Sequence, residues 1–75
     1  MTPISTGNFY YFPEDDSIWM ITDISSRIGL ILVAGNHSSS TSLLPEYINL
    51  YGRYLGNIAT TPTSQLKDFY PELFI

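Results

Sequence analysis

The first half of the chain alternates between apolar runs and short polar segments. Four consecutive aromatic residues occupy positions 9–12, and a proline with acidic and serine residues, which favour turns, follows at 13–17. From 18 to 24 the side chains alternate with the period of two that is typical of a strand, which puts Trp19 and Ile21 on the same face. The pattern predicts a β-hairpin with a five-residue loop.

A third strand is predicted over 28–34, after the polar connection 25–27. This stretch is apolar on both of its faces, as expected of a strand that is central in its sheet or lies across an interface. Gly29 within it indicates a bulge or the close approach of another backbone. The segment 9–34 is therefore predicted to be a three-stranded antiparallel meander, with strands near 8–12, 18–24 and 28–34.

The second half of the chain favours helices. After a polar, serine-rich loop at 35–42, apolar residues recur with helical spacing at Leu44, Tyr47, Ile48, Tyr51 and Leu55, which predicts a helix over 45–55. Pro62 opens a second, short helix over 63–69, and Pro71 ends it. Residues near 57–60 are expected to form a fourth strand, and the apolar tail 72–75 is expected to dock on this core or on another chain.

The predicted fold class is α+β in a single small domain, 1–75. A loose leader, 1–8, precedes a small three- to four-stranded antiparallel sheet that is packed by one main helix and a short C-terminal helix. Strand competes with helix in 46–60, because Gly56-Asn57 is suited to a hairpin turn and the flanking residues are strand formers. The alternative is an all-β small barrel in which 46–60 is a hairpin.

Composition and charge exclude several functional classes. The 75 residues carry seven acidic and three basic side chains, a net charge of −4, and no cysteine, so disulfides and zinc–thiolate sites are excluded. Scattered basic residues argue against binding to nucleic acid, whose phosphates need clustered Lys and Arg. With no basic, apolar leader and no apolar run near the ~20 residues that span a bilayer, we expect a cytoplasmic protein without membrane insertion.

No residue pattern indicates catalysis, a metal or a cofactor. The acidic turn Glu14-Asp15-Asp16 lacks the alternate spacing and the glycine of a calcium loop, so it is interpreted as a solvated turn or as a contact for a basic partner. His37 is followed by serines, but nothing there would orient it as a base, and it is interpreted as an exposed loop residue. The S-x-x-K string at 64–67 lacks its companion motifs and is interpreted as the start of a helix.

Aromatic residues carry the remaining functional signal. Six Tyr, four Phe and one Trp are more rings than so small a core is expected to enclose, and exposed aromatic patches are typical of association sites. If the helix covers one face of the sheet, the other face stays exposed. The predicted partner-binding residues are the aromatic and apolar side chains of that exposed face with an acidic rim: Tyr10, Phe12, Glu14, Asp15, Asp16, Trp19 and Ile21.

The sequence thus predicts a non-enzymatic, acidic protein-binding module, such as an inhibitor, an immunity-type antidote or an accessory subunit. Its partner is expected to be another protein with a basic surface, because opposite charge speeds the encounter. Two alternatives stay open. One is a self-assembling structural homo-oligomer, and the other is an inhibitor that mimics nucleic acid through its acidic residues.

Overall fold

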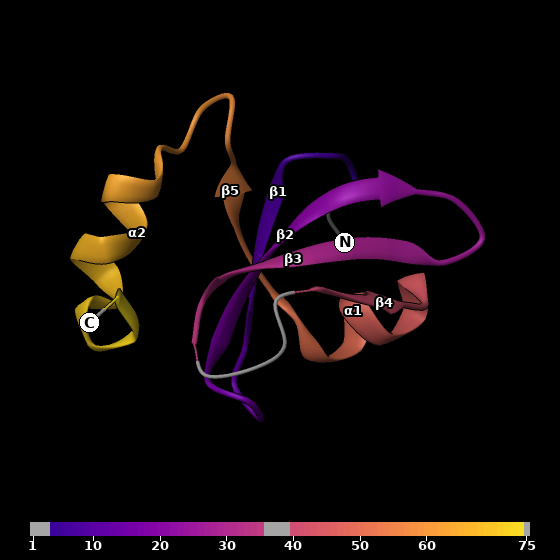
Figure 1. The fold of residues 1–75 in the computed structure, drawn as a ribbon, viewed down its shortest axis with the longest axis horizontal. Coiled ribbons are helices and arrows are strands. Elements are labelled where there is room, and N and C mark those ends of the chain that lie inside the picture. Colours follow the sequence, from indigo (N-terminus) through magenta and orange to yellow (C-terminus); the bar gives the residue numbers. More distant parts are fainter. Residues whose placement is uncertain (1–3, 36–39, 75) are drawn as a thin grey trace.

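Residues 4–35 and 40–74, which the computed structural model describes, form one antiparallel sheet with helices on both sides (Figure 1). The strands are β1 (Asn8–Phe12), β2 (Ser17–Ile24), β3 (Ile28–Ala34), β4 (Ser40–Leu43) and β5 (Arg53–Asn57). The helices are α1 (Pro45–Tyr51), α2 (Thr63–Phe69) and the 3-10 helix η1 (Pro71–Phe74). The predicted α+β class is confirmed, and the sheet has five strands rather than three or four.

The N-terminal meander is confirmed. β1 pairs with β2 so that Tyr10 lies opposite Trp19, and β2 pairs with β3 so that Ile21 lies opposite Leu30. The register of β2 shifts by one residue opposite Gly29, which is the irregularity that a glycine in this strand predicts. β3 is central in the sheet, because β2 and β4 pair with its two edges.

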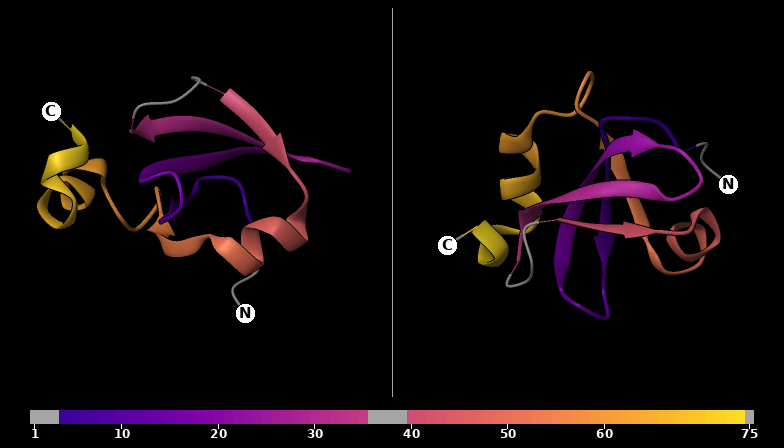
Figure 2. Two further views of the ribbon diagram at one scale, coloured as in Figure 1. Left: turned by 90° about the horizontal axis from the view of Figure 1, so that it is seen from below. Right: turned by 45° about the vertical axis from the view of Figure 1, so that its right-hand side comes forward.

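The chain returns to the start of the sheet after α1. β5 pairs antiparallel with β1, so the strand order is β4-β3-β2-β1-β5, and β4 and β5 are the two outer strands. α1 joins these two strands and lies against one face of the sheet, while α2 lies on the opposite side (Figure 2). Both faces are therefore partly covered by segments of the second half of the chain.

The main helix is shorter than predicted and is followed by a strand. α1 ends at Tyr51, four residues before the predicted end at position 55, because Gly52 has extended backbone angles and donates its N–H to the carbonyl of Ile48. A Cβ atom at Gly52 would come within 3.3 Å of the rings of Phe12 and Tyr10, so this close approach needs a glycine. The fourth strand, predicted near 57–60, lies earlier in the chain, at 53–57, and is β5. The alternative hairpin over 46–60 is wrong, because 45–51 form a helix.

The polar loop predicted over 35–42 is wrong at its C-terminal end, since 40–43 form β4 and pair with β3. Arg27 holds this strand by donating hydrogen bonds from its guanidinium to the hydroxyl and the carbonyl of Ser42. His37 and its neighbouring residues 36–39 lie outside the described residues, as do 1–3 and Ile75. Asn8, the last residue of the predicted loose leader 1–8, is instead the first residue of β1 and is buried.

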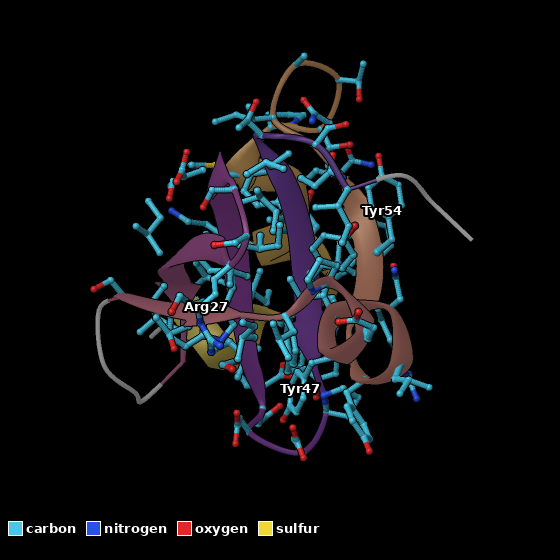
Figure 3. All side chains as sticks on the ribbon, turned by 90° about the vertical axis from the view of Figure 1, so that its right-hand side faces the viewer. Arg27, Tyr47 and Tyr54 are labelled. Carbon is cyan, nitrogen blue, oxygen red and sulfur yellow. The ribbon has the colours of Figure 1, made fainter. Side chains whose placement is uncertain are left out.

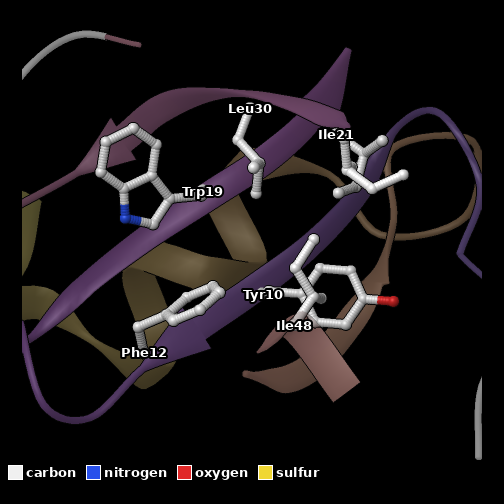
Figure 4. Packing of buried hydrophobic residues seen from close by; sticks show 7 residues of the cluster. Tyr10, Phe12, Trp19, Ile21, Leu30 and Ile48 are labelled. Atoms are coloured by element: carbon white, nitrogen blue, oxygen red, sulfur yellow. The ribbon is translucent and has the colours of Figure 1, made fainter. Parts of the chain in front are cut away.

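The apolar residues form two clusters, one on each face of the sheet. The first joins Tyr10, Phe12, Trp19, Ile21 and neighbours from β3 to Ile48 of α1 (Figure 4). The second joins one residue from each of β1, β2, β3 and α2, namely Phe9, Ile18, Ala34 and Leu66. Leu73, Phe74 and other partly buried residues pack against it. The apolar tail thus docks on this core, as far as position 74. No helix among the described residues is long and apolar enough to cross a membrane.

Candidate interaction surface

The aromatic face predicted to bind a partner is instead the core of the molecule. Tyr10 and Phe12 are each 2% exposed, Trp19 is 6% exposed and Ile21 is 1% exposed. α1 lies over them and inserts Ile48 among them (Figure 4). These four side chains present no open face to a partner in the folded protein, because the helix that the sequence placed on one face of the sheet covers this one.

Polar groups within this core find partners inside the protein. The indole N–H of Trp19 donates to the hydroxyl of Ser17 at 2.7 Å, and Ser17 is fully buried. The amide of Asn8 donates to the hydroxyl of Tyr10 at 3.4 Å and accepts from the amide of Asn57 at 2.8 Å. Burial raises the pKa of the Tyr10 hydroxyl. The bond between Asn57 and Asn8 joins β5 to β1, and the other two lie within β2 and within β1, which indicates a structural role.

The three acidic residues of the predicted site are exposed at the turn between β1 and β2. Tyrosines from both faces of the sheet hold this turn. The hydroxyl of Tyr47 in α1 donates to the carboxylate of Glu14 (Tyr47 is labelled in Figure 3), and this bond raises the pKa of Tyr47 to about 12. The hydroxyl of Tyr11 donates to Asp16 at 2.7 Å, which raises the pKa of Tyr11. The acidic turn is therefore fixed in place as well as charged.

Exposed apolar side chains gather in the second half of the chain rather than on the predicted face. Leu50 is 74% exposed and Phe69 is 69% exposed, and Tyr51 and Tyr54 are about half exposed. We call these four residues the β5 surface, because each lines a hollow beside β5: Leu50 and Tyr51 line one where α1 meets the strand, and Tyr54 and Phe69 line one between the strand and α2. Large exposed apolar groups of this kind are typical of association sites.

Two hollows adjoin β5. The larger, of about 390 Å³, lies between β5 and α2, and we call it the β5–α2 hollow. Its lining includes Tyr54 and Leu55 from the strand and Gln65, Leu66, Phe69 and Tyr70 from the helix side. The other, of about 330 Å³, lies where α1 meets β5 and is lined by residues that include Leu50, Tyr51 and Arg53, with Glu14 from the acidic turn. The β5 surface therefore reaches into both hollows.

Part of the predicted site meets at a third, smaller hollow of about 180 Å³ near the turn between β1 and β2. Phe12, Asp15 and Trp19 line it together with Thr41 of β4 and Tyr47 of α1. Tyr10 and Ile21 are not among its lining residues. Phe12 and Trp19 are almost entirely buried even though they line this hollow. The acidic residues of the predicted site are therefore exposed, whereas its apolar residues are not.

The described residues hold no group of three or more His, Cys, Asp or Glu side chains that would bind a metal ion. Comparison of the chain with models of protein families, with curated proteins and with solved structures finds no match. The function is therefore inferred from the surface alone.

Sequence reasoning missed Leu50 and Phe69, although part of the signal was present. Leu50 falls outside the helical stripe that contains Tyr47, Ile48 and Tyr51, and an apolar residue off that stripe faces away from the core. Phe69 is the last residue of a seven-residue helix that buries Leu66 alone. Its exposure depends on how α2 lies against the sheet, which the sequence does not show.

Proposed function

We propose that this protein is a non-enzymatic protein-binding module that docks another protein through the β5 surface. The observation that carries the proposal is the exposure of large apolar side chains beside two hollows, one where α1 meets β5 and one between β5 and α2. Complete burial of one such side chain contributes about 1.5–3 kcal/mol, so covering several of them stabilises a complex substantially. Large side chains that enter pockets are also typical of interface hot spots.

The charge of the protein supports a partner with a basic surface. The net charge is −4, and Glu14 lies in the lining of the smaller of the two hollows beside β5. Because the tyrosine hydroxyls of Tyr47 and Tyr11 hold the acidic turn, its charges are positioned before a partner arrives. Such a fixed acidic rim speeds encounter with a basic surface and favours it over an acidic one.

A matched pair of variants tests the proposal. Phe69→Ser removes an exposed ring of the β5 surface, and Ile24→Ser makes the same kind of change at a 47% exposed residue at the end of β2. Immobilised wild-type protein is used to isolate a partner from cell extract, and calorimetry then measures its affinity for each variant. We expect Phe69→Ser to weaken binding at least about tenfold and Ile24→Ser to leave it unchanged. Equal affinity for both variants contradicts the proposal.

Self-assembly is a second candidate, favoured by a specific observation. β4 and β5 are outer strands of an open sheet, so each has one edge that no other strand among the described residues pairs with. Such edges are templates for pairing with another chain. Light scattering after size-exclusion chromatography separates the two functions. A monomer is expected for the binding module, and a stable closed oligomer supports self-assembly.

A further inference from the structure

The β5–α2 hollow lies beside the free edge of β5 rather than on a face of the sheet. Tyr54 and Leu55 are consecutive in the strand, at a bulge where Leu55 has no opposite residue in β1. The ring of Tyr54 packs edge-on against Tyr10 of the first cluster, with 5.8 Å between ring centroids, whereas Leu55 packs against the second cluster. A hollow lined by both residues therefore adjoins the strand edge (Tyr54 is labelled in Figure 3). An occupant of this hollow meets backbone groups that no strand of the described chain pairs with.

The free edge is short. Gly56 has φ +126°, and Thr61 packs so closely against it that a Cβ atom would collide with the threonine side chain. Thr61 also lines the hollow. The edge open to an occupant is thus limited to 53–55, about 10 Å at the usual rise of a strand. A single extended segment fits such an edge, whereas the full edge of a second sheet needs a longer one.

The walls of the hollow suit one large apolar side chain. Buried Leu66 and half-buried Leu55 contribute apolar surface, the rings of Tyr54 and Phe69 are exposed, and Gln65 adds a polar group. Buried apolar floors with polar rims are the usual setting of an anchoring residue at an interface. The volume of about 390 Å³ falls within the range of pockets that hold drug-sized ligands.

The carboxylate of Asp68 beside the hollow favours an occupant in which Lys or Arg flanks the inserted apolar side chain. Asp68 is three residues from Gln65 and so lies beside the lining on the helix surface. The ammonium of Lys67 instead lies over the ring of Phe74, 5.8 Å from its centroid. Arg53 lies opposite Tyr11 in the β1–β5 pair, and the hydroxyl of Tyr11 binds a carboxylate of the acidic turn. An occupant therefore meets the carboxylate of Asp68 on the helix side of the hollow and exposed Arg53 on the strand side, and a second copy is disfavoured because the 53–55 edge is too short for the edge of a second sheet.

We propose that the β5–α2 hollow binds an extended segment of a different protein, which pairs with 53–55 and inserts one large apolar side chain flanked by Lys or Arg. This mode, in which a peptide adds a strand to a sheet edge, takes affinity from backbone hydrogen bonds and specificity from a side-chain pocket. It rests on the proposed function and specifies which part of the β5 surface the partner contacts and by what chemistry.

A synthetic peptide tests this mode directly. The probe has one central phenylalanine, a valine on each side of it, a lysine at each end, and blocked termini. Titration of the isotope-labelled protein, followed by NMR, is expected to shift the amide signals of 53–55 and 65–69. We expect Phe69→Ser to weaken binding at least about tenfold and Ile24→Ser to leave it unchanged, with the signal dispersion of each variant verifying its fold.

Two modified peptides separate the parts of the proposal. Methylation of the backbone nitrogens removes hydrogen bonds worth about 0.5–1.5 kcal/mol each, so binding is expected to fall about two- to tenfold for each hydrogen bond removed. Replacement of both lysines by glutamate is expected to weaken binding relative to the lysine peptide, because Asp68 repels the glutamates. The difference in affinity is expected to grow as the salt concentration is lowered, because salt screens this repulsion. Undiminished affinity of the methylated peptide overturns strand pairing, and undiminished affinity of the acidic peptide overturns the basic flank.

The two levels of the proposal fail in different ways. If partner capture depends on Phe69 but the peptide shifts no signals at 53–55, strand addition is overturned and the protein-binding function stands. If capture is independent of Phe69, the protein-binding function through the β5 surface fails first. If the protein instead self-associates and Phe69→Ser makes it monomeric, the occupant is a second copy and the inference of a different protein is wrong.

Discussion

Two alanine substitutions that shorten a side chain by equal amounts report whether the β5–α2 hollow is open in solution. α1 and α2 have seven residues each, and each helix buries one of them, Ile48 in α1 and Leu66 in α2. Ile48→Ala and Leu66→Ala remove the same number of carbon atoms from a helix that covers a face of the sheet. Both side chains are buried in a cluster, but Leu66 of the second cluster also lines the β5–α2 hollow, whereas Ile48 of the first cluster lines none of the three hollows.

The expected costs follow from burial and from the space left behind. At about 0.8 kcal/mol per buried carbon, the transfer contribution is roughly 2.4 kcal/mol for either variant. Ile48→Ala also leaves an enclosed cavity among aromatic rings, which brings its total to about 3–4 kcal/mol. Leu66→Ala enlarges a hollow that is already open, so its cavity contribution is small and its total stays near about 2.5 kcal/mol. A chain of this length is stable by about 4–11 kcal/mol, so both variants keep a folded majority wherever the wild-type stability exceeds about 4 kcal/mol.

Urea unfolding followed by far-ultraviolet circular dichroism measures both costs. The slope of the free energy of unfolding with urea concentration must match that of the wild type for the comparison to be valid. We expect Ile48→Ala to lose about 1 kcal/mol more than Leu66→Ala. A cost for Leu66→Ala that equals or exceeds that of Ile48→Ala would refute the reasoning. It would mean that Leu66 is as enclosed as Ile48, and that the hollow is closed in the free protein.

Three further changes test the core, the acidic turn and the end of β5. Ser17→Ala leaves the buried indole N–H of Trp19 without its acceptor, and urea unfolding should show a loss of about 1–3 kcal/mol. Tyr47→Phe removes the bond to Glu14. Folding raises the pKa of Tyr47 from 10.0 to about 12. The wild type is therefore expected to have its full excess in free energy of unfolding over Tyr47→Phe below pH 10, and to lose that excess as the pH rises through about 12. Urea unfolding at each pH measures this difference. Gly56→Ala introduces a Cβ atom at φ +126° and should cost about 1–3 kcal/mol by the same assay.

Local patterns were sufficient for the elements whose boundaries are set by nearby residues. The meander followed from alternation over 18–24 and from the turn residues on either side of it. α2 begins after Pro62 and ends before Pro71, as the restrictions that proline places on its neighbours predict. These signals are read within a few positions of the element, and the structure confirms them.

Tertiary contacts decided the elements that the sequence did not predict correctly. β4 is rich in serine and threonine, and it is a strand because β3 offers an edge and Arg27 holds Ser42. α1 ends at Tyr51 because the backbone of the next residue, Gly52, lies against rings of β1 that are 40 or more positions earlier in the chain. Neither contact has a local pattern, so periodicity alone extended the helix and left β4 as a loop.

The sequence showed an excess of apolar side chains but not where they lie, and the size of the two covering helices explains the difference. Seven residues make about two turns, so each helix contacts the sheet along one narrow side. Leu50 is two positions from Ile48 and therefore points away from the core, while Phe69 lies beyond Leu66 at the helix end. α1, which buries the predicted aromatic face, and α2, which covers the other face, thus carry Leu50 and Phe69, the two most exposed of the large apolar residues that the structure describes. Changes at Leu50 or Phe69 are accordingly expected to alter association while leaving the free energy of unfolding nearly unchanged.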